Sequence, residues 1–580
     1  MTTANTGVFG IDLGTTNSVI ARLHDGVPQA LEVDGSAIVP SVVMYTEDGR
    51  VLVGREARNL AVLHPDRVVR SIKRRMGQSE PVEVAGKSLL PEQISAEILR
   101  SLSAAAQATT GEKVSDVVIT VPAYFNDAQR RATLAAGELA GLRVLRLLNE
   151  PTAASLVYDH ARADQASAPE LVLVYDLGGG TFDVSVLEVF EDVREVRATT
   201  GNTSLGGDDF DDALVRMFVD ELGTARGLEL DAAAKARLRS AAEAAKIVLS
   251  TELEVEVREE FIAVANSKPV HLQLTVTRHE FEAAIMGMLS TTIELAQRAI
   301  QDAKLGPEEQ IGRICMVGGS TRIPLVRTLL AEAFEVDIHE EIDVDLAVGL
   351  GAAIQCGMLS GVSCDRILVD VAAHSLGLRA VGDEDDLYLE DGPDTFVAVL
   401  HRNTALPADR TREMYTMVDD QELVRVDVFQ GEAPRCSENL SIGSFELELE
   451  PARRSTPVRF RFAYDLDGVV RVTASQVGAE AKQKTVALRL PDATQTQRDP
   501  ARAGPAAGPA TDRATPDLSQ IGTDNALIRR AKRLLETVKD PTHAQLVQLI
   551  LAWQAATPNQ REEIEDELLD LFLEQEAGEV

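Results

Sequence analysis

Residues 1 to about 360 alternate short strands rich in Val and Ile with longer helical stretches rich in Ala. This alternation is typical of an α/β domain with mainly internal sheets. Segments 7–23 and 173–189 share one pattern, in which an apolar strand is followed by an Asp, a Gly-containing turn with Thr, and a second apolar strand. We therefore predict two related lobes with a cleft between them.

The pattern changes after residue 371, where short strands such as 423–429 and 458–462 alternate apolar and polar positions. Gly, Pro and Asp turns separate these strands, which is typical of an all-β domain. The apolar stretch 365–370 has acidic ends, and it is either a connector between domains or an extra edge strand. The pattern favours neither. We predict an α/β domain, an interdomain linker and a β domain at 1–364, 365–371 and 372–491.

Residues 492–517 contain four prolines among Ala, Gly and Thr, a composition that cannot form a core and is typical of a semi-extended linker. Residues 518–580 then carry three amphipathic stretches. One apolar stripe consists of Leu546, Leu549, Ile550 and Trp553. These stretches predict a small C-terminal helical bundle, so the fold class is a multidomain protein with α/β, β and α parts.

The chain has 92 Asp and Glu against 57 Lys and Arg, a net charge of −35. This charge repels nucleic acids and anionic lipids, so we expect neither as a partner. The four cysteines form no CxxC pair and match no zinc spacing, which is typical of a reducing compartment and makes a structural metal site improbable. The sequence has neither a signal-peptide pattern nor an apolar run of about 20 residues, so we expect a cytoplasmic protein.

Two turns with Gly and Thr are candidates for phosphate binding. In segment 12–17, Gly14 permits a tight turn, and backbone N–H groups and Thr hydroxyls can donate to phosphate oxygens. Asp12 can hold the water molecules of a cation. Segment 176–183 repeats this arrangement with three glycines and a second Asp. We expect the two turns to grip a polyphosphate from opposite sides.

Two further segments are weaker candidates for a ligand site. Segment 317–324 follows an apolar strand and opens a helix, which would direct backbone amides toward a ligand, although close packing is an equal alternative. Glu243, Lys246 and Ser250 share one face of a predicted helix. Without context, a solvated polar face is the better interpretation of these three residues.

Several longer motifs follow one another in the α/β region. They are GIDLGTTNS from Gly10, TVPAYFNDAQRRAT from Thr120, LLNEPTAAS from Leu147, VYDLGGGTFDVSVLE from Val174, LGGDDFDDAL from Leu205, EAAKIVLS from Glu243 and VGGSTRIP from Val317. With these motifs the chain resembles the DnaK-type 70-kDa heat-shock chaperone family. The resemblance continues in SLGL from Ser375, HRNTALP from His401, VFQGE from Val428 and FAYDLDGVVRVTA from Phe462.

The resemblance implies an actin-like two-lobed ATPase domain, a β-sandwich that binds extended hydrophobic peptides, and a helical lid. It implies that ATP hydrolysis, with Mg²⁺ and K⁺ as cofactors, switches the affinity for unfolded client proteins. It also implies a J-domain co-chaperone and a nucleotide-exchange factor as partners.

The resemblance also assigns roles within the α/β domain. Lys73 matches the catalytic lysine, which can orient the attacking water and offset charge on the γ-phosphoryl group. The implied catalytic set is Lys73, Glu150, Asp176, Thr181 and Asp183. The implied metal-binding carboxylates are Asp12, Asp176 and Asp183. The implied nucleotide-binding residues are Asp12, Gly14, Thr15, Thr16, Asn17, Arg74, Gly178, Gly179, Gly180, Gly206, Gly207, Glu243, Lys246, Ser250, Gly318, Gly319, Ser320, Arg322 and Asp345.

Communication and peptide binding are assigned in the same way. The implied coupling residues are Pro122, Arg130, Arg146, Leu368 and Asp370. In the β domain the resemblance places Val424 in a central pocket lined by Leu378, with Val381 and Met417 as an arch over the peptide. Core packing remains an alternative for Val424 and Leu378.

The chain departs from the family pattern at several points. Segment 370–377 reads DVAAHSLG where the family usually has a Thr-Pro pair followed by Leu. The sequence therefore leaves open how strongly the ATPase domain and the β domain are coupled. Val344 and Leu346 stand where the family usually has a Pro and a Glu. Segment 76–94 is shorter than in general-purpose members of the family. Because only residues 518–580 follow the linker, the chain resembles short-lidded members typified by HscC, and we expect weak clamping of peptide.

Two other functions share the actin-like fold with its Gly-rich phosphate turns. A small-molecule kinase acting on a sugar is the first alternative, and an actin-like filament protein is the second. The β region after residue 371 and the TVPAYFND and NEPTAA motifs argue against both, because these features lie outside the shared core.

Overall fold

The computed structural model describes residues 7–160, 169–190, 193–223, 230–265, 268–339, 343–362, 367–381, 394–466, 469–479 and 482–487. The chain divides into two compact units, 1–497 and 498–580, and all described residues belong to the first. The predicted helical bundle, and all but the first few residues of the linker that precedes it, belong to the second unit. Both lie outside the described residues, so the short lid remains a prediction.

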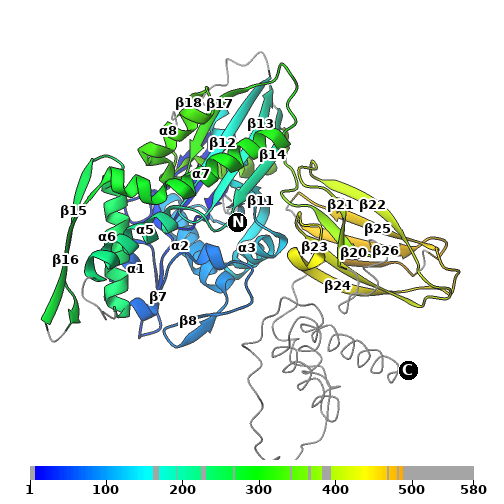
Figure 1. Cartoon of the computed structure of the whole chain (residues 1–580), viewed down its shortest axis with the longest axis horizontal. Coiled ribbons are helices and arrows are strands. Elements are labelled where there is room, and N and C mark those ends of the chain that lie inside the picture. The colour runs from blue at the N-terminus through cyan, green and yellow to red at the C-terminus, as the bar shows by residue number, and fades with distance from the viewer. Residues whose placement is uncertain are drawn as a thin grey trace, which may run out of the picture. The chain divides into compact units, whose positions relative to one another are not determined.

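Two six-stranded sheets form the α/β part of the chain and repeat one topology (Figure 1). The orders are β11-β10-β1-β2-β3, with β4 paired to β2, and β18-β17-β12-β13-β14-β19. In each sheet an antiparallel meander of three strands is extended by two parallel strands beside its first strand. The repeated sequence pattern is therefore confirmed as two related lobes.

The strands of the first lobe's sheet are β1 (Phe9–Asp12), β2 (Asn17–His24), β3 (Val27–Ala30), β4 (Val39–Pro40), β10 (Asp116–Val121) and β11 (Arg143–Asn149). Those of the second are β12 (Glu170–Leu177), β13 (Phe182–Phe190), β14 (Val193–Asn202), β17 (Ile311–Val317), β18 (Asp337–His339) and β19 (Ile367–Val369). The first lobe also carries the short strands β5 (Val43–Tyr45), β6 (Val51–Val53), β7 (Val68–Val69), β8 (Val82–Val84) and β9 (Lys87–Leu89). The second carries the hairpin of β15 (Glu254–Ala265) and β16 (Lys268–Thr277).

Three helices, α3, α6 and α7, begin at residues whose side chains cap them. Asn126 and Gln129 accept each other's backbone N–H groups at the start of α3, and Thr277 and Glu280 do the same at α7. The described helices are α1 (Arg55–Leu60), α2 (Pro91–Thr110), α3 (Asp127–Leu139), α4 (Glu150–His160), α5 (Gly207–Gly223), α6 (Ala232–Leu249), α7 (Arg278–Asp302), α8 (Pro324–Ala333) and α9 (Ala347–Leu359).

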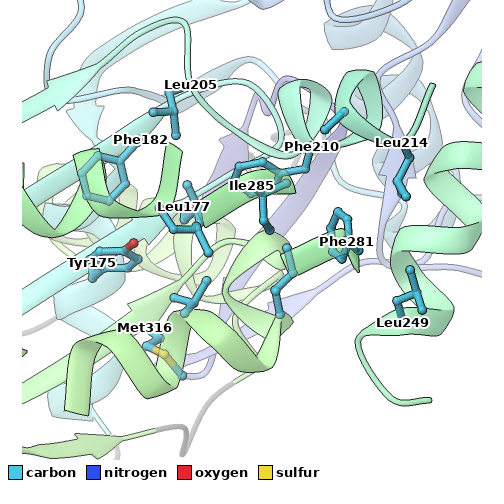
Figure 2. Close-up of a cluster of buried hydrophobic side chains, with 14 of the residues drawn as sticks. Tyr175, Leu177, Phe182, Leu205, Phe210, Leu214, Leu249, Phe281, Ile285 and Met316 are labelled. Atoms are coloured by element: carbon cyan, nitrogen blue, oxygen red, sulfur yellow. The ribbon is translucent and has the colours of Figure 1, made fainter. Parts of the chain in front are cut away.

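Each lobe has its own apolar core, and a third core joins the lobes. In the second lobe Tyr175, Phe182, Phe210 and Phe281 are fully or almost fully buried in one cluster (Figure 2). The third cluster takes side chains from both sheets together with α4 and α9. These two helices therefore fix how the sheets lie around the space between them.

Two glycines allow α9 to approach its neighbours closely. A Cβ on Gly351 would lie 1.8 Å from the Ala153 carbonyl oxygen of α4, and one on Gly10 of β1 would lie 2.1 Å from the Ala353 nitrogen. No rotamer change relieves a clash with backbone atoms. The contact between α9, α4 and β1 thus requires glycine at both positions.

The region after residue 371 is a β-sandwich of two four-stranded antiparallel sheets. One consists of β21 (Thr395–Leu400), β20 (Leu376–Ala380), β23 (Leu423–Gln430) and β24 (Leu440–Glu448). The other consists of β22 (Ala408–Tyr415), β25 (Pro457–Tyr464), β26 (Val470–Gln476) and β27 (Lys484–Ala487). Buried side chains alternate along β25 and β26 and join those of β23 in one core, as the alternating pattern predicts.

The connector is an edge strand in this structure. Ile367, Leu368 and Val369 form β19, which pairs in parallel with Val193, Arg194 and Glu195 of β14. Of the two readings that the sequence left open, the strand is thus the one observed. The predicted domain boundaries around it remain predictions.

We expect Gly351→Ala to lower the free energy of unfolding by about 2 kcal/mol, because its Cβ forces α9 away from α4. Gly287→Ala is the matched control, since Gly287 lies within α7 and a Cβ there meets nothing within 4 Å. It should stabilise the chain by about 0.5–1 kcal/mol through helix propensity. Thermal unfolding measures both changes, and equal shifts of one sign would contradict the packing argument.

Candidate active site

A cleft of about 1020 Å³ is lined by residues of both lobes, including Asp12 at the end of β1, Asp176 near the end of β12 and Val317 at the end of β17. Most predicted site residues of the α/β part line it. They are Asp12, Gly14, Thr15, Thr16, Asn17, Lys73, Glu150, Asp176, Gly178, Gly179, Thr181, Glu243, Lys246, Ser250, Gly318, Gly319, Ser320, Arg322 and Asp345.

Four of the predicted nucleotide-binding residues lie behind the lining instead of in it: Arg74, Gly180, Gly206 and Gly207. Arg74 donates from Nε to the Gly180 carbonyl at 2.9 Å and forms an ion pair with Asp209. A Cβ on Gly206 would lie 2.7 Å from the Gly180 nitrogen, and Gly207 begins α5 at the same point. These residues therefore support the second turn from behind.

The two predicted phosphate turns touch each other at the base of the cleft. A Cβ on Gly179 would lie 1.8 Å from Thr16 Oγ1, and one on Gly180 would lie 2.4 Å from Thr15 Cγ2. Glycine is thus required in the second turn because the threonines of the first turn occupy the space. The contact brings hydroxyl and backbone N–H donors of both lobes to one place.

Lys73 is buried in this region and forms an ion pair with Glu150. It lies in a short 3-10 helix, residues 72–75, that follows Ser71 in the left-handed conformation (φ 52°). Burial by itself lowers the pKa of Lys73, but the carboxylates of Glu150 and Asp12 outweigh it and the pKa is raised. The lysine is therefore charged at neutral pH.

Three aspartates surround the pair, of which Asp176 and Asp183 are buried and Asp12 is half-buried. Burial, reinforced by the Glu150 charge, raises the pKa of Asp12 and of Asp183 to about 7 and that of Asp176 well above its usual value. Asp12 accepts a hydrogen bond from Thr120 Oγ1 at 2.8 Å. Asp183 does not line the cleft, and its Oδ1 accepts the Tyr124 N–H at 2.9 Å.

The carboxylates outnumber the cations at the base of the cleft. Lys73 is the cation that faces Asp12, Glu150, Asp176 and Asp183. Burial is the main cause of the raised pKa values of the three aspartates, and the charge of Glu150 raises them further. The set therefore fits a site that gains a cation. Within the described residues no group of three or more His, Cys, Asp or Glu is arranged to hold a metal ion directly.

The opposite wall of the cleft comes from α6 and the loops after β17 and β18. Lys246 pairs with Asp211 at 2.8 Å and donates to the Gly207 carbonyl at 2.9 Å. Glu243 pairs with Arg58 at 2.8 Å. The α6 face that carries Lys246 and Glu243 thus lines the cleft and is not merely a solvated surface.

Sequence reasoning missed several charged partners at this wall. Arg322 donates to both Asp343 and Asp345 at 2.8 Å, and Arg70 lies 3.7 Å from Glu243. Asp343 is two residues from a predicted site residue, and Asp211 follows the Gly-Gly pair at the start of α5, so proximity along the chain was a usable signal for both. Nothing in the sequence pairs Arg58 or Arg70 with α6.

The predicted coupling residues gather around the connector. Asp370 is buried and accepts hydrogen bonds from Asn149 Nδ2 at 2.8 Å and from the Val371 N–H at 2.8 Å. Burial raises the pKa of Asp370, while Arg130 and Arg146 act in the opposite direction. Leu368 lies beside them in β19. Pro122 follows β10 immediately, and it is buried.

Arg130 links this group to the first lobe. Its Nη2 donates to Asn149 Oδ1 at 2.6 Å and to the Ala123 carbonyl at 3.2 Å, and its Nε donates to the Phe125 carbonyl at 3.2 Å. Because Asn149 also donates to Asp370, one amide connects the arginine with the connector aspartate.

The predicted peptide residues lie in the first sheet of the β-sandwich and in its loops. Leu378 is 2% exposed within the core, as its core-packing alternative expects, and Val424 is partly buried against the same core. Met417 is 51% exposed and Val381 is half-buried. The β-sandwich therefore has an apolar floor at Leu378 and Val424 and two more accessible apolar side chains, Met417 and Val381.

Comparison with known proteins decides the family. The model of the family described as Hsp70 protein matches residues 8–502. Chaperone protein DnaK from Thermotoga petrophila is 44% identical over 490 residues, which is 83% of this chain and 80% of the relative. The proteins of the same description from Thermotoga maritima and Thermotoga neapolitana match to the same extent.

The chain belongs to the Hsp70 family. It is an ATPase and an ATP-dependent chaperone of the Hsp70 type, and the sugar-kinase alternative is wrong. Membership also accounts for the nucleotide-sized cleft between the lobes and for the β-sandwich that follows it.

No described helix of this Hsp70-family chain combines the length and apolar character needed to cross a membrane. Cys315, Cys356 and Cys436 carry buried thiols, while Cys364 lies outside the described residues. Burial raises the pKa of Cys356 to about 11, so this thiol stays protonated.

The pH dependence of stability tests the electrostatics of the α6 wall. Burial raises the pKa of Asp211 to about 6 from 3.8, although Lys246 acts in the opposite direction. Between about pH 4 and 6 the folded chain holds a proton that the unfolded chain has lost, so this group's stabilising contribution falls as the pH rises through 6. The variant Asp211→Asn has no group that titrates at this position, so its stability does not fall in this way as the pH rises.

We expect the stability of Asp211→Asn, relative to the unaltered chain, to rise by about 1 kcal/mol between pH 5 and pH 7. Urea unfolding without nucleotide measures this difference. Asp212→Asn is the matched control, because the Asp212 side chain is 45% exposed. A difference for Asp211→Asn that stays constant with pH would show that its pKa is not raised.

Proposed function

We propose that the cleft binds ATP with its phosphates at the two touching turns and its adenosine toward α6 and Arg322. The observation that carries this proposal is the buried Lys73–Glu150 pair beside those turns. Phosphate oxygens would accept from the hydroxyls and backbone N–H groups of 14–16 and 178–181. Glu243, Lys246 and Ser250 would contact the nucleoside.

Hydrolysis by this site requires positioning and charge stabilisation more than a strong base. Lys73 would orient the attacking water and offset charge on the γ-phosphoryl group, while Glu150 holds the lysine in place. Thr181 would contact the γ-phosphate. The low exposure of these residues excludes other water, which strengthens each electrostatic contact.

Mg²⁺ fits the surplus of carboxylates at the base of the cleft. Asp12, Asp176 and Asp183 would hold it through its water shell, and the ion would neutralise charge on the phosphates. We also propose that a K⁺ ion binds near Thr181 and Asp183. Ionised aspartates would be favoured by either cation, since their raised pKa values arise from burial and neighbouring acids.

We further propose that the β-sandwich binds extended hydrophobic segments of unfolded proteins. Val424 would form the pocket for one apolar side chain, with Leu378 beneath it and Val381 and Met417 above the peptide backbone. Backbone hydrogen bonds would supply affinity that does not depend on client sequence. The apolar character and graded exposure of the four side chains support this assignment.

Strand β19 would be the two-state element that links the two activities. Its pairing with β14 involves three residues, and Asp370 at its end is bonded to Asn149. Release of this strand would separate the β-sandwich from the second lobe, so nucleotide state and peptide affinity would change together. Pro122, Arg130 and Arg146 would relay the change.

The remaining parts of the proposal concern partners and location. A J-domain co-chaperone and a nucleotide-exchange factor are the proposed partners, and the cytoplasm is the proposed location. A short lid would clamp peptide weakly, so peptide would be released quickly even with ADP bound. A slow rate of peptide release in ADP would exclude this weak clamping.

We expect Lys73→Ala to bind ATP with nearly unchanged affinity and to lose at least about 100-fold in kcat, because a transition-state contact is removed. Single-turnover hydrolysis and equilibrium binding of a fluorescent ATP analogue separate the two effects. Lys235→Ala, an exposed position on α6, serves as the matched control. Turnover of Lys73→Ala at the level of this control would exclude the assigned role.

We expect Val424→Phe to weaken the binding of a fluorescent Leu-rich peptide at least tenfold, because the larger ring fills the proposed pocket. Basal ATP hydrolysis should stay unchanged. Leu440→Phe adds similar bulk at an exposed position of the same sheet and should bind peptide normally. If both variants retain the original affinity, the groove lies elsewhere in the β-sandwich.

A further inference from the structure

A line of hydrogen bonds connects the β-sandwich to Asp183 through the main chain of Tyr124. Tyr124 lies between β10 and α3 of the first lobe. Its N–H donates to Asp183 Oδ1 at 2.9 Å, and its carbonyl oxygen lies 3.0 Å from His374 Nε2. Both peptide planes that flank the Tyr124 Cα are thereby fixed, one by each partner.

The protonation state of His374 follows from its surroundings. A carbonyl can only accept, so Nε2 of His374 carries the proton and donates it. Burial lowers the pKa of His374, although the Tyr124 carbonyl and the Glu432 carboxylate act in the opposite direction, and Arg130 and Arg402 lower it further. The ring is therefore a neutral donor at neutral pH. It packs against the Tyr124 ring with 4.1 Å between centroids and an angle of 54° between the ring planes.

His374 is held in place by the β-sandwich. The next residue, Ser375, donates from its N–H and its Oγ to the Glu432 carboxylate at 2.7 and 2.9 Å. Ser375 Oγ accepts the Arg402 N–H at 3.0 Å, and Arg402 reaches Asp302 of α7 at 2.8 Å. The position of the imidazole thus depends on the β-sandwich lying against the ATPase lobes.

The other end of the line has little room to move. A Cβ on Gly201 would lie 2.9 Å from Asp183 Oδ1 and 3.0 Å from the Tyr124 Cβ. The carboxylate and the tyrosine are therefore packed against bare backbone. A shift of the Tyr124 main chain is passed to Asp183 and is not absorbed by a side chain.

We propose that His374 is a positioning residue for ATP hydrolysis, which holds Asp183 through the Tyr124 main chain when the β-sandwich is seated. His374 lies in segment 370–377, one of the places where the sequence departs from the family pattern. The proposal rests on the proposed catalytic role of Asp183. Because His374 touches no cleft residue in the hydrogen bonds described, it acts on kcat and not on nucleotide binding.

The test compares His374→Leu with His374→Gln in the full chain. Leucine fills the space beside the Tyr124 ring but cannot donate, whereas the glutamine amide can donate to the Tyr124 carbonyl. We expect His374→Leu to lower kcat about threefold to tenfold with unchanged KM for ATP, and His374→Gln to recover most of that loss. A role in packing alone predicts the reverse order, and that order overturns the proposal.

A double-mutant cycle with Asp183→Asn separates this inference from the proposed function. If His374 acts through Asp183, His374→Leu has no further effect on kcat in the Asp183→Asn chain. Additive losses overturn the inference and leave the catalytic role of Asp183 intact. An Asp183→Asn chain with unchanged kcat overturns both.

Asn403→Ala controls for loss of domain contact in general. Asn403 of the β-sandwich accepts the Thr199 N–H at 3.2 Å and has no bond to Tyr124. We expect its effect on kcat to be smaller and additive with Asp183→Asn. If Asn403→Ala lowers kcat as much as His374→Leu does and is equally non-additive with Asp183→Asn, the inference is overturned. The fall in kcat would then come from loss of contact between the β-sandwich and the ATPase lobes and not from loss of the imidazole.

Discussion

The buried ion pair between Lys73 and Glu150 is the interaction on which the site depends. A lone ammonium in this region would be costly, because burial by itself lowers the pKa of Lys73, and the pair reverses that direction. The two residues come from a 3-10 helix of the first lobe and from the start of α4, which packs between the sheets. Glu150 directly follows β11 of the first lobe, so the chain holds the pair at the point where the threonines and glycines of the two turns meet.

The same dependence extends from the cleft to the β-sandwich. Glu150 follows Asn149 directly, and Asn149 joins Arg130 to the connector aspartate, Asp370. A change at one end of this short segment of chain affects the position of the other end. The reason is that all four side chains are buried and have few alternative partners: Arg130, Asn149, Glu150 and Asp370. The proposed catalytic site and the contact with the β-sandwich thus share one piece of backbone, which would provide a physical basis for the proposed coupling.

Much of the fold was accessible from the sequence, and the reasons differ among elements. The repeated strand-turn-strand segments predicted related lobes because each depends on local apolar alternation and on glycine in a turn. The α6 face was assigned to the nucleotide only through family resemblance, since spacing along a helix does not say what the face meets. The connector stayed undecided because a three-residue apolar stretch pairs with a sheet edge only if a free edge, here β14, lies nearby.

The sequence by itself determined the family, the positions of the two turns with Gly and Thr, and most of the residues that line the cleft, because these reside in contiguous motifs whose chemistry is local. Only the tertiary structure decided which charged and polar groups face one another. Arg58 with Glu243, Asp211 with Lys246, and His374 with Tyr124 are brought together from distant parts of the chain. Such pairs follow from the packing of whole elements, and no local pattern of residues encodes them.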